Sequence, residues 1–221
     1  EATASSGCGG FTDYDAFLAQ KDLELVIVAS QSQDHERHTL QALAAGKHVL
    51  CEKPACLEPE GLRKMAVLAR KSGCLLAIHH NQRLYPDFLA IKEVVESGKL
   101  GEIFRIRRAY ASFQRRNDWQ VLMKYNGGIL SNWGTHIIDQ TLHLAGSPPR
   151  HIWSTLRREF NPGDAEDVLR ALITCEIGVV LDLEVSYVNA SKGPSWVVQG
   201  MRGSAWLQGK TLFTKYLQSR I

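Results

Sequence analysis

A stripe of polar side chains lies on one predicted helix, residues 128–144, in a pattern that suits acid–base chemistry. The stripe consists of Asn132, His136, Asp139 and His143. Their offsets of 0, 4, 7 and 11 place all four on one helical face, away from apolar Ile138 and Leu142. Burying them without partners would cost about 1 to 3 kcal/mol per group, so the stripe faces water or a polar cavity. A cleft between two domains would provide that cavity, and a solvated helix face explains the spacing equally well.

A second candidate is Lys53, which stands between Glu52 and Pro54 directly after a predicted strand. A lysine at a strand end can donate a hydrogen bond to a reacting oxygen and stabilise charge there. Lysines are also common in solvated surface loops. The position alone therefore leaves both interpretations open.

The histidines offer no metal site by their spacing. His35 and His38 lie one helical turn apart, but no acidic or thiol side chain follows at a useful distance. Adjacent His79 and His80 point to opposite faces of a strand and cannot both bind one ion. We therefore predict no metal ligands.

An alternation of strands and helices positions Lys53. The predicted elements are a strand over residues 23–30, a helix over 34–45, a strand over 49–51, a helix over 59–72 and a strand over 75–79. The run LELVIVAS, from Leu23 to Ser30, is nearly all apolar, which is typical of a strand buried on both faces of a parallel sheet. Doubly wound parallel sheets bind ligands at the carboxyl ends of their strands. Those ends carry Ser30, Glu52, Lys53 and His80.

The glycine-rich turn of a dinucleotide-binding sheet is absent from the chain. Such a sheet begins with a strand followed by Gly-x-Gly-x-x-Gly. Gly7, Gly9 and Gly10 do not fit, because Thr12 stands where the third glycine should be and no predicted strand precedes them. The chain also begins with Glu1 rather than Met. We expect that it is part of a longer protein.

Beyond Arg83 the apolar pattern changes to alternation. The predicted strands cover residues 104–110, 152–158, 168–175, 179–186, 196–200 and 205–207, and the predicted helices cover 86–96 and 128–144. Strands with one wet face and helices set apart from them predict an antiparallel or mixed α+β domain. The fold class is therefore α/β, with a doubly wound parallel sheet followed by an α+β domain.

Composition excludes several classes of partner. The 221 residues carry a net charge of only +3, spread along the chain, so neither nucleic acid nor a membrane surface is an expected partner. No apolar run approaches the roughly 18 residues of a membrane span, and the start does not resemble a secretory signal. The five cysteines are far apart, as expected for reduced core residues. The expected location is the cytoplasm.

Four motifs occur in a recognisable order. They are GKHVLCEKP at residues 46–54, NQRLYP at 81–86, SGKLGEIFRIR at 97–107 and GGILSNWGTHIIDQ at 127–140. Together they resemble the glucose-fructose oxidoreductase, inositol dehydrogenase and rhizopine-catabolism (Gfo/Idh/MocA) family. The resemblance implies a partial Rossmann domain over residues 1–82 and a domain with a large open, mostly antiparallel sheet over 83–221. It implies an NAD(P)-dependent oxidoreductase that acts on a hydroxyl carbon of a sugar, cyclitol or related polyol.

The resemblance also implies roles for individual residues. Lys53 corresponds to the lysine that anchors the reacting oxygen, and His136 to the acid/base residue. The residues that would line the binding site of NAD or NADP are Ser30, His35, Glu52, Lys53, Asn81 and Arg83. Substrate would be bound by Asn132, Asp139, Trp119 and Arg116. A hydride would pass between the substrate carbon and the nicotinamide while His136 takes or returns the hydroxyl proton. Relatives that cleave glycosidic bonds through transient oxidation use the same site, so that activity is an alternative.

Two departures from the family pattern stand out. Many members have Asp where this chain has Asn132, which cannot hold a negative charge beside an imidazolium but can orient the ring. The opening strand, turn, helix and strand, at least about 30 residues, are missing, together with the residue that selects NAD or NADP. The final strands end early, after Leu217. We expect a longer gene product, because residues 23–30 would otherwise form an exposed apolar edge strand. The alternative is a cofactor-free remnant with a binding or regulatory role.

The substrate and the assembly follow less directly. The loop over residues 114–125, with Arg115, Arg116 and Trp119, suits a polyol, an acid or a phosphate. An open sheet that carries Trp196 and Trp206 suggests a homodimer or homotetramer formed through its face.

Overall fold

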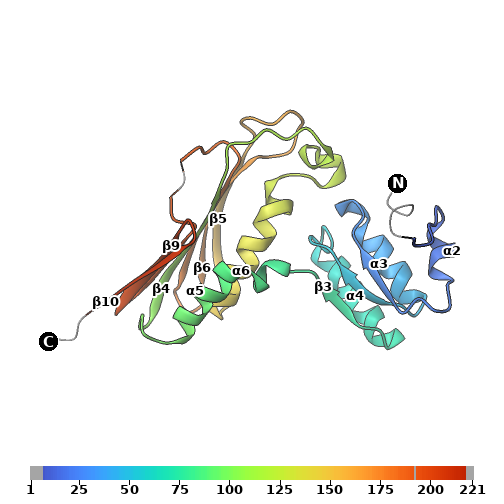
Figure 1. Ribbon diagram of the computed structural model, residues 1–221, viewed down its shortest axis with the longest axis horizontal. Helices are drawn as coiled ribbons and strands as arrows, with labels where there is room; N and C mark the ends of the chain where they lie inside the picture. Colours follow the sequence, from blue (N-terminus) through green and yellow to red (C-terminus); the bar gives the residue numbers. More distant parts are fainter. Residues whose placement is uncertain (1–6, 192, 218–221) are drawn as a thin grey trace. The chain divides into compact units, whose positions relative to one another are not determined.

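The structure, a computed structural model, describes residues 7–191 and 193–217 (Figure 1). The chain divides into two compact units after His79, rather than after residue 82 as expected from the sequence.

The first unit contains a three-stranded parallel sheet in the order β1-β2-β3. Its elements are α2 (Tyr14–Leu18), β1 (Leu25–Val28), the 3-10 turn η1 (Ser32–Asp34), α3 (His35–Ala44), β2 (His48–Cys51), α4 (Pro59–Ser72) and β3 (Leu76–Ile78). The predicted alternation of strands and helices is confirmed, and the short helix α2 is an addition. Helix α4 ends at Gly73, whose φ of 69° lies in the left-handed region that favours glycine.

Strand β1 is buried on one face only, so the prediction of burial on both faces was wrong for this chain. Val26 and Val28 are 3% exposed, whereas Leu25 is 51% and Ile27 62% exposed. In a sheet of order β1-β2-β3, right-handed crossovers place both α3 and α4 on the same face, and these helices pack against each other (Figure 1). Within the described residues, no helix covers the opposite face of this sheet.

The second unit contains a seven-stranded mixed sheet in the order β10-β9-β8-β4-β7-β6-β5. Its strands are β4 (Ile103–Ala111), β5 (Pro149–Arg157), β6 (Val168–Cys175), β7 (Val180–Ser186), β8 (Trp196–Gly200), β9 (Gly203–Gln208) and β10 (Thr211–Tyr216). Its helices are η2 (Asn81–Leu84), α5 (Pro86–Glu96), η3 (Trp119–Val121), η4 (Met123–Tyr125), η5 (Leu130–Gly134) and α6 (Thr135–Ala145). Strands β4 and β7 pair in parallel and the other neighbours are antiparallel, which confirms the predicted sheet.

Register separates the two faces of this sheet, because residues opposite each other on neighbouring strands share a face. One row comprises Leu212, Leu207, Trp196, Arg108, Leu183 and Ala171. It lies on the face that α5 and α6 cover, and most of its side chains belong to the core (Figure 1). The next row comprises Phe213, Trp206, Val197, Arg107, Asp182, Leu172 and Trp153. It lies on the opposite face, which is called the open face below.

Trp196 is a core residue, so its assignment to the open face was wrong. It is 0% exposed, and the guanidinium carbon of Arg108 lies 4.6 Å from its ring centroid. Burial lowers the pKa of Arg108 to about 10, and the nearby Asp87 carboxylate acts in the opposite direction. Strand alternation puts Trp196 and Trp206 on opposite faces, and only Trp206 belongs to the open face.

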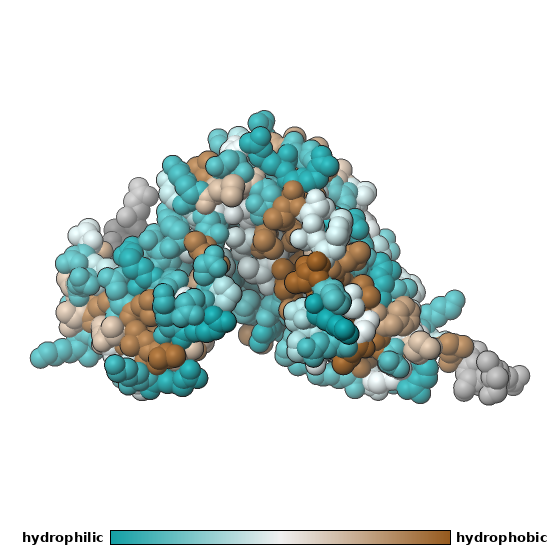
Figure 2. Space-filling model, turned by 180° about the vertical axis from the view of Figure 1, so that it is seen from behind, coloured by the Kyte–Doolittle hydropathy of each residue, from teal (hydrophilic) through white to brown (hydrophobic). Residues whose placement is uncertain are grey.

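Apolar side chains reach the surface in separate patches. Exposed examples are Leu25 and Leu75 in the first unit and Phe113 and Trp153 in the second. On the face seen in Figure 2, brown apolar patches are separated by teal hydrophilic surface. Among the described residues, no helix is both long enough and apolar enough to cross a membrane.

A buried carboxylate holds one loop of the second unit. Asp167 is 0% exposed, and its side chain accepts the backbone N–H groups of Glu159, Phe160 and Asn161 at 2.8, 2.8 and 2.7 Å. The side chain of Asn161 in turn accepts the backbone N–H of Arg116 at 2.8 Å. Asp167 therefore supports the loop that carries a predicted substrate-binding residue.

Asp167→Ala is expected to lower the free energy of unfolding of this unit by about 3 kcal/mol, because three charge-assisted hydrogen bonds are lost. Urea unfolding followed by tryptophan fluorescence measures it, since all five tryptophans of the chain lie in this unit. Asp164, an exposed carboxylate that accepts one N–H from Met123 at 2.8 Å, is the matched control. Asp164→Ala should cost under about 1.5 kcal/mol. Equal losses in the two variants would contradict the role of Asp167.

Candidate functional site

Polar residues of the first unit gather at one edge of its sheet. Ser30 follows β1, Glu52 and Lys53 follow β2, and His79 follows β3. Because the strands are parallel, their carboxyl ends meet at the same edge, where open α/β sheets bind ligands. The structure thus brings together Ser30, Glu52 and Lys53, as the sequence predicted.

The Glu52 carboxylate links neighbouring strand ends. Its Oε1 lies 2.5 Å from Nδ1 of His79, and its Oε2 accepts the backbone N–H of Lys53 at 3.3 Å. Burial alone would raise the pKa of Glu52, but the hydrogen bonds with His79 and with the Lys53 backbone hold this pKa below its ordinary value. Glu52 is therefore an anion fixed at the sheet edge. His79 was not among the predicted site residues, since its only sequence signal is its place at the end of a strand.

His35 lies beneath this edge rather than on its surface. It is 2% exposed, with Nδ1 2.7 Å from the carbonyl oxygen of Pro54 and Nε2 2.9 Å from that of Ser30. A ring nitrogen that carries hydrogen donates to the carbonyl it faces. His35 therefore joins the end of β1 to the segment after β2. This structural role comes in addition to the predicted role of His35 as a cofactor-lining residue.

The first unit has room for part of a dinucleotide beside this edge. A cavity of about 620 Å³ is lined by residues 9–14, residues 26–30, Phe17 and His38, a size typical of small-ligand sites. The Ser30 hydroxyl lies at its wall, 2.9 Å from Nδ1 of His38. The backbone at the end of β1 and the Ser30 hydroxyl line this cavity, while the Glu52 carboxylate stands at the end of the neighbouring strand β2, outside the cavity lining. These are groups that suit the hydroxyls of a nucleotide, and the sheet edge therefore fits part of a nicotinamide dinucleotide.

In the second unit, the polar stripe begins in a π-helical turn. Residues 130–134 form the π-helix η5, and α6 continues from Thr135, so the predicted single α-helix over 128–144 was wrong in its first part. A π turn takes in one more residue than an α turn, which changes the direction of Asn132 relative to His136. Such turns inside helices occur frequently at functional sites.

Two groups of polar side chains lie around α6 and the π-helical turn before it, and the first group is centred on Asp139. Asp139 accepts two hydrogen bonds from Arg83, 2.8 Å from Nε and 2.5 Å from Nη2, and Nδ1 of His80 lies 3.7 Å from the same carboxylate. The hydrogen bond to Asp139 raises the pKa of Arg83. His136 is 6% exposed, and its ring centroid lies 6.4 Å from that of His80 and 6.2 Å from that of Trp133.

His80 thus lies between His136 and the Arg83–Asp139 ion pair. Arg83, which was predicted to line the cofactor, is held by Asp139 within the second unit. Asn81 lies beside it in η2, half-buried. His143 does not join the group, because it is exposed and packs near Phe88, with 6.0 Å between ring centroids.

The second group of polar side chains surrounds Asn132. Its Nδ2 donates to Oε1 of Gln120 at 2.7 Å and to the hydroxyl of Tyr187 at 3.4 Å. Burial raises the pKa of Tyr187, while a hydrogen bond with Arg116 acts against this rise. Gln120 and Tyr187 were missed by the sequence interpretation, since no spacing connects a loop residue or a strand end to the helix.

One of the two arginines in the predicted substrate loop is paired with a carboxylate of the same loop. Arg116 forms an ion pair with Asp118 at 2.6 Å, and Arg115 lies over the ring of Phe160, 5.9 Å from its centroid. Trp119 begins η3 and is half-buried. The pairing of Arg116 weakens the argument that this loop selects an acidic substrate. Among the described residues, no group of three or more histidine, cysteine or acidic side chains is placed to hold a metal ion.

The variant Asn132→Asp tests the effect of Asn132, which stands where many members of the family that the motifs resemble have Asp. A carboxylate at this position stabilises the protonated ring and makes the ring a stronger base, so in the oxidation direction the rise of kcat should move to higher pH, and the rate above that rise should be up to about tenfold faster. Gln120 must turn its amide to donate to the new acceptor. The measurement is the pH profile of kcat, with Asn132→Ala as the control that removes the hydrogen bonds without adding charge. An unchanged profile would show that this position does not act on the base.

Comparisons with known proteins agree in both halves of the chain. The family model described as "Oxidoreductase family, NAD-binding Rossmann fold" matches residues 1–80, and the "GFO/IDH/MocA C-terminal domain" matches residues 88–206. The scyllo-inositol 2-dehydrogenase (NADP(+)) IolW of Bacillus subtilis is 38% identical over 185 residues, which are 82% of this chain and 51% of that protein.

Solved structures show the same fold. The NAD-binding protein from Listeria innocua has a TM-score of 0.91 at 31% identity, over 96% of this chain and 61% of that one. GenD2 from gentamicin A biosynthesis, solved in complex with NAD, has a TM-score of 0.82 at 26% identity, over 97% of this chain and 60% of that one. The chain spans about half the length of the curated relatives it matches.

Proposed function

The chain belongs to the Gfo/Idh/MocA family of oxidoreductases, with an NAD-binding Rossmann fold in its first half, and from this premise we propose that the whole protein is an NAD(P)-dependent dehydrogenase. Its substrate is a hydroxyl-bearing carbon of a cyclitol, a sugar or a related polyol. The observation that carries the proposal is buried His136, whose ring centroid lies 6.4 Å from that of His80, and His80 in turn lies 3.7 Å from the Asp139 carboxylate that Arg83 holds. An acid–base group beside fixed polar groups suits a reaction that moves the proton of a hydroxyl.

The residues of the first unit hold the cofactor and the reacting oxygen. Ser30, Glu52 and Lys53 would bind NAD or NADP at the sheet edge. The bound nicotinamide supplies the carbon that accepts or returns the hydride. The ammonium group of Lys53 donates to the substrate oxygen and stabilises the negative charge that develops as its proton leaves.

The residues of the second unit manage the proton and the remaining hydroxyls. A ring nitrogen of His136 takes the hydroxyl proton during oxidation and returns it during reduction. Asp139 and Arg83 are fixed by each other, so they offer an acceptor and a donor in set directions to neighbouring hydroxyls. A ligand with adjacent hydroxyl groups fits such a pair, which favours polyols.

Cofactor reduction with a panel of polyols tests this function. The full-length protein is mixed with NAD⁺ or NADP⁺ and with scyllo-inositol, myo-inositol, glucose or methyl glucoside, and absorbance of the reduced nicotinamide is followed. We expect reduction with at least one polyol and a clear preference for one cofactor. Failure to bind NADH and NADPH, with no reduction by any polyol, would favour a cofactor-free binding or regulatory protein instead.

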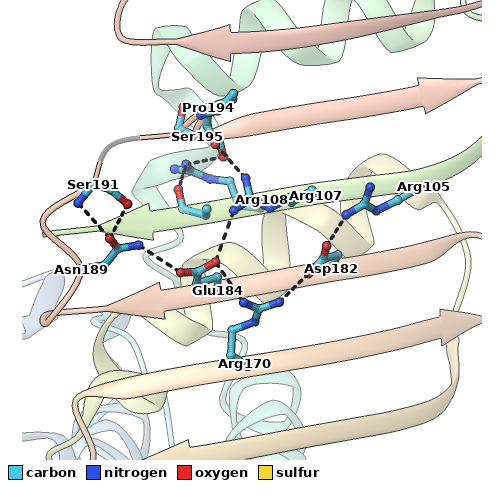
Figure 3. A network of polar contacts seen from close by, with 11 residues as sticks. Arg105, Arg107, Arg108, Arg170, Asp182, Glu184, Asn189, Ser191, Pro194 and Ser195 are labelled. Carbon is cyan, nitrogen blue, oxygen red and sulfur yellow. Dashed lines mark hydrogen bonds and ion pairs between the residues drawn. The ribbon is translucent and has the colours of Figure 1, made fainter. Parts of the chain in front are cut away.

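We also propose that the open face joins copies of this chain into a homodimer or homotetramer. Figure 3 shows alternating charges on β4, β6 and β7: Arg170 lies 3.8 Å from Asp182 and 3.4 Å from Glu184, and Arg105 and Arg107 pair with the same two carboxylates. A surface that carries both signs in alternation can complement a second copy about a twofold axis.

Aromatic side chains lie on either side of these charges. Trp206 stacks on Phe213 with 5.4 Å between ring centroids, and Trp153 is 59% exposed on β5. Trp206→Glu should reduce the mass in solution, measured by light scattering, to that of a monomer. Leu89→Glu, at an exposed leucine of α5, is the control. A monomeric wild-type protein would contradict this assembly.

A further inference from the structure

The backbone at Lys53 is held from two directions by the side chains of Glu52 and His35. On one side, the backbone N–H of Lys53 donates to Oε2 of Glu52 at 3.3 Å. On the other side, the carbonyl oxygen of the next residue, Pro54, lies 2.7 Å from Nδ1 of His35. The segment that carries the proposed catalytic ammonium thus has a fixed contact before it and after it.

The two supports differ in strength. His35 is 2% exposed and also lies 2.9 Å from the carbonyl oxygen of Ser30, so its place is set by the ends of two segments. Glu52 could rotate freely if only the Lys53 N–H held it, because its side chain is 32% exposed. The second contact of Glu52, from its Oε1 to Nδ1 of His79 at 2.5 Å, prevents that rotation.

His79 is suited to this task by its position. It follows β3, the strand next to β2, and its backbone N–H donates to the carbonyl oxygen of Cys51 at 2.8 Å. The ring is therefore anchored to the same strand end that carries Glu52. Its side chain is 40% exposed, so the ring contributes little to the core of the unit.

We propose that His79 is a positioning residue for Lys53. His79 holds the Glu52 carboxylate in place as the acceptor of the Lys53 backbone N–H, while His35 holds the next residue, Pro54, from the other side. The role rests on the proposed function, since it gives His79 an effect on turnover through Lys53. The contacts themselves belong to the first unit and exist without substrate.

Hydrogen exchange of the Lys53 amide tests the contact directly in the full-length protein without cofactor. In His79→Leu, the Lys53 amide should exchange at least about fivefold faster, because its acceptor becomes mobile. The amides of Val49 and Glu52, which donate to the carbonyl oxygens of Leu75 and Val28, should be unchanged. His79→Gln keeps a side-chain donor and should restore most of the protection. An unchanged Lys53 amide in a folded His79→Leu protein would overturn the proposal.

Turnover in a double-mutant cycle tests the consequence. His79→Leu should lower kcat about tenfold in the wild-type background and less than about twofold when Glu52→Gln is already present, because the histidine acts through the carboxylate. Equal losses in both backgrounds would mean that His79 does not act through Glu52. If no polyol is oxidised while the Lys53 amide responds as expected, the proposed function fails and the positioning contact stands.

Discussion

Replacing Lys53 by alanine should lower kcat about 100-fold or more while the protein stays folded. The ammonium group donates to an oxygen that gains negative charge only as the reaction proceeds, so its loss raises the barrier rather than weakening ground-state binding. The KM for the polyol should therefore change much less than kcat. The measurement is steady-state kinetics with the best substrate of the panel.

Lys47 provides the matched control for this variant. It stands just before the other end of β2, and its Nζ donates to the carbonyl oxygen of Gln20 at 2.8 Å. Lys47→Ala removes the same type of side chain beside the opposite end of the same strand without touching the proposed site, and it should keep full turnover. A Lys53→Ala enzyme that turns over at the wild-type rate would show that the assignment of Lys53 is wrong.

Replacing His136 by alanine should reduce kcat by about 10²- to 10⁴-fold and flatten its dependence on pH. In the oxidation direction the unprotonated ring accepts the hydroxyl proton, so the wild-type rate rises with pH as the ring loses its own proton. Without the ring, this rise disappears. The pH profile of kcat, measured for oxidation, tests the sign as well as the size of the effect.

His143 is the control on the same helix. It lies seven residues after His136 and is exposed beside Phe88, outside the group around Asp139. His143→Ala should keep both the rate and the pH profile. If His136→Ala keeps the wild-type pH dependence, another group performs the proton transfer.

The sequence predicted the elements well where local periodicity and end signals agree. Helix α4 is one example, since Pro59 begins it and Gly73 ends it, as expected from these residue types. Periodicity could not show which face of β1 is covered, because that depends on where α3 and α4 lie after the crossovers. Leu25 and Ile27 are therefore exposed in a strand whose composition indicates full burial.

The candidate site was predictable where its residues share one element. His136 and Asp139 lie three residues apart on α6, so helical spacing puts them on one face of the helix. The partner of Asp139 could not be derived in this way, because Arg83 stands 56 residues earlier and only the fold brings it near. The same holds for Asn132 and Tyr187, which are 55 residues apart.

The family resemblance narrowed the chemistry, but not the surroundings of each residue. It pointed to His35 as part of the cofactor lining, and the structure adds that both ring nitrogens face backbone carbonyl oxygens. The local reason is that His35 begins α3 directly after the turn that follows β1, so its ring lies under the strand end. Motifs identify positions, and contacts decide what a side chain does there.

Transfer of deuterium tests the central claim most directly. The full-length protein is incubated with its preferred cofactor and with the best polyol of the panel, deuterated at its hydroxyl-bearing carbons, and the reduced cofactor is examined by mass spectrometry. A hydride transfer moves the substrate's own hydrogen, so we expect the reduced nicotinamide to carry deuterium. No reduced cofactor with any polyol, or a reduced cofactor without deuterium, would contradict the account.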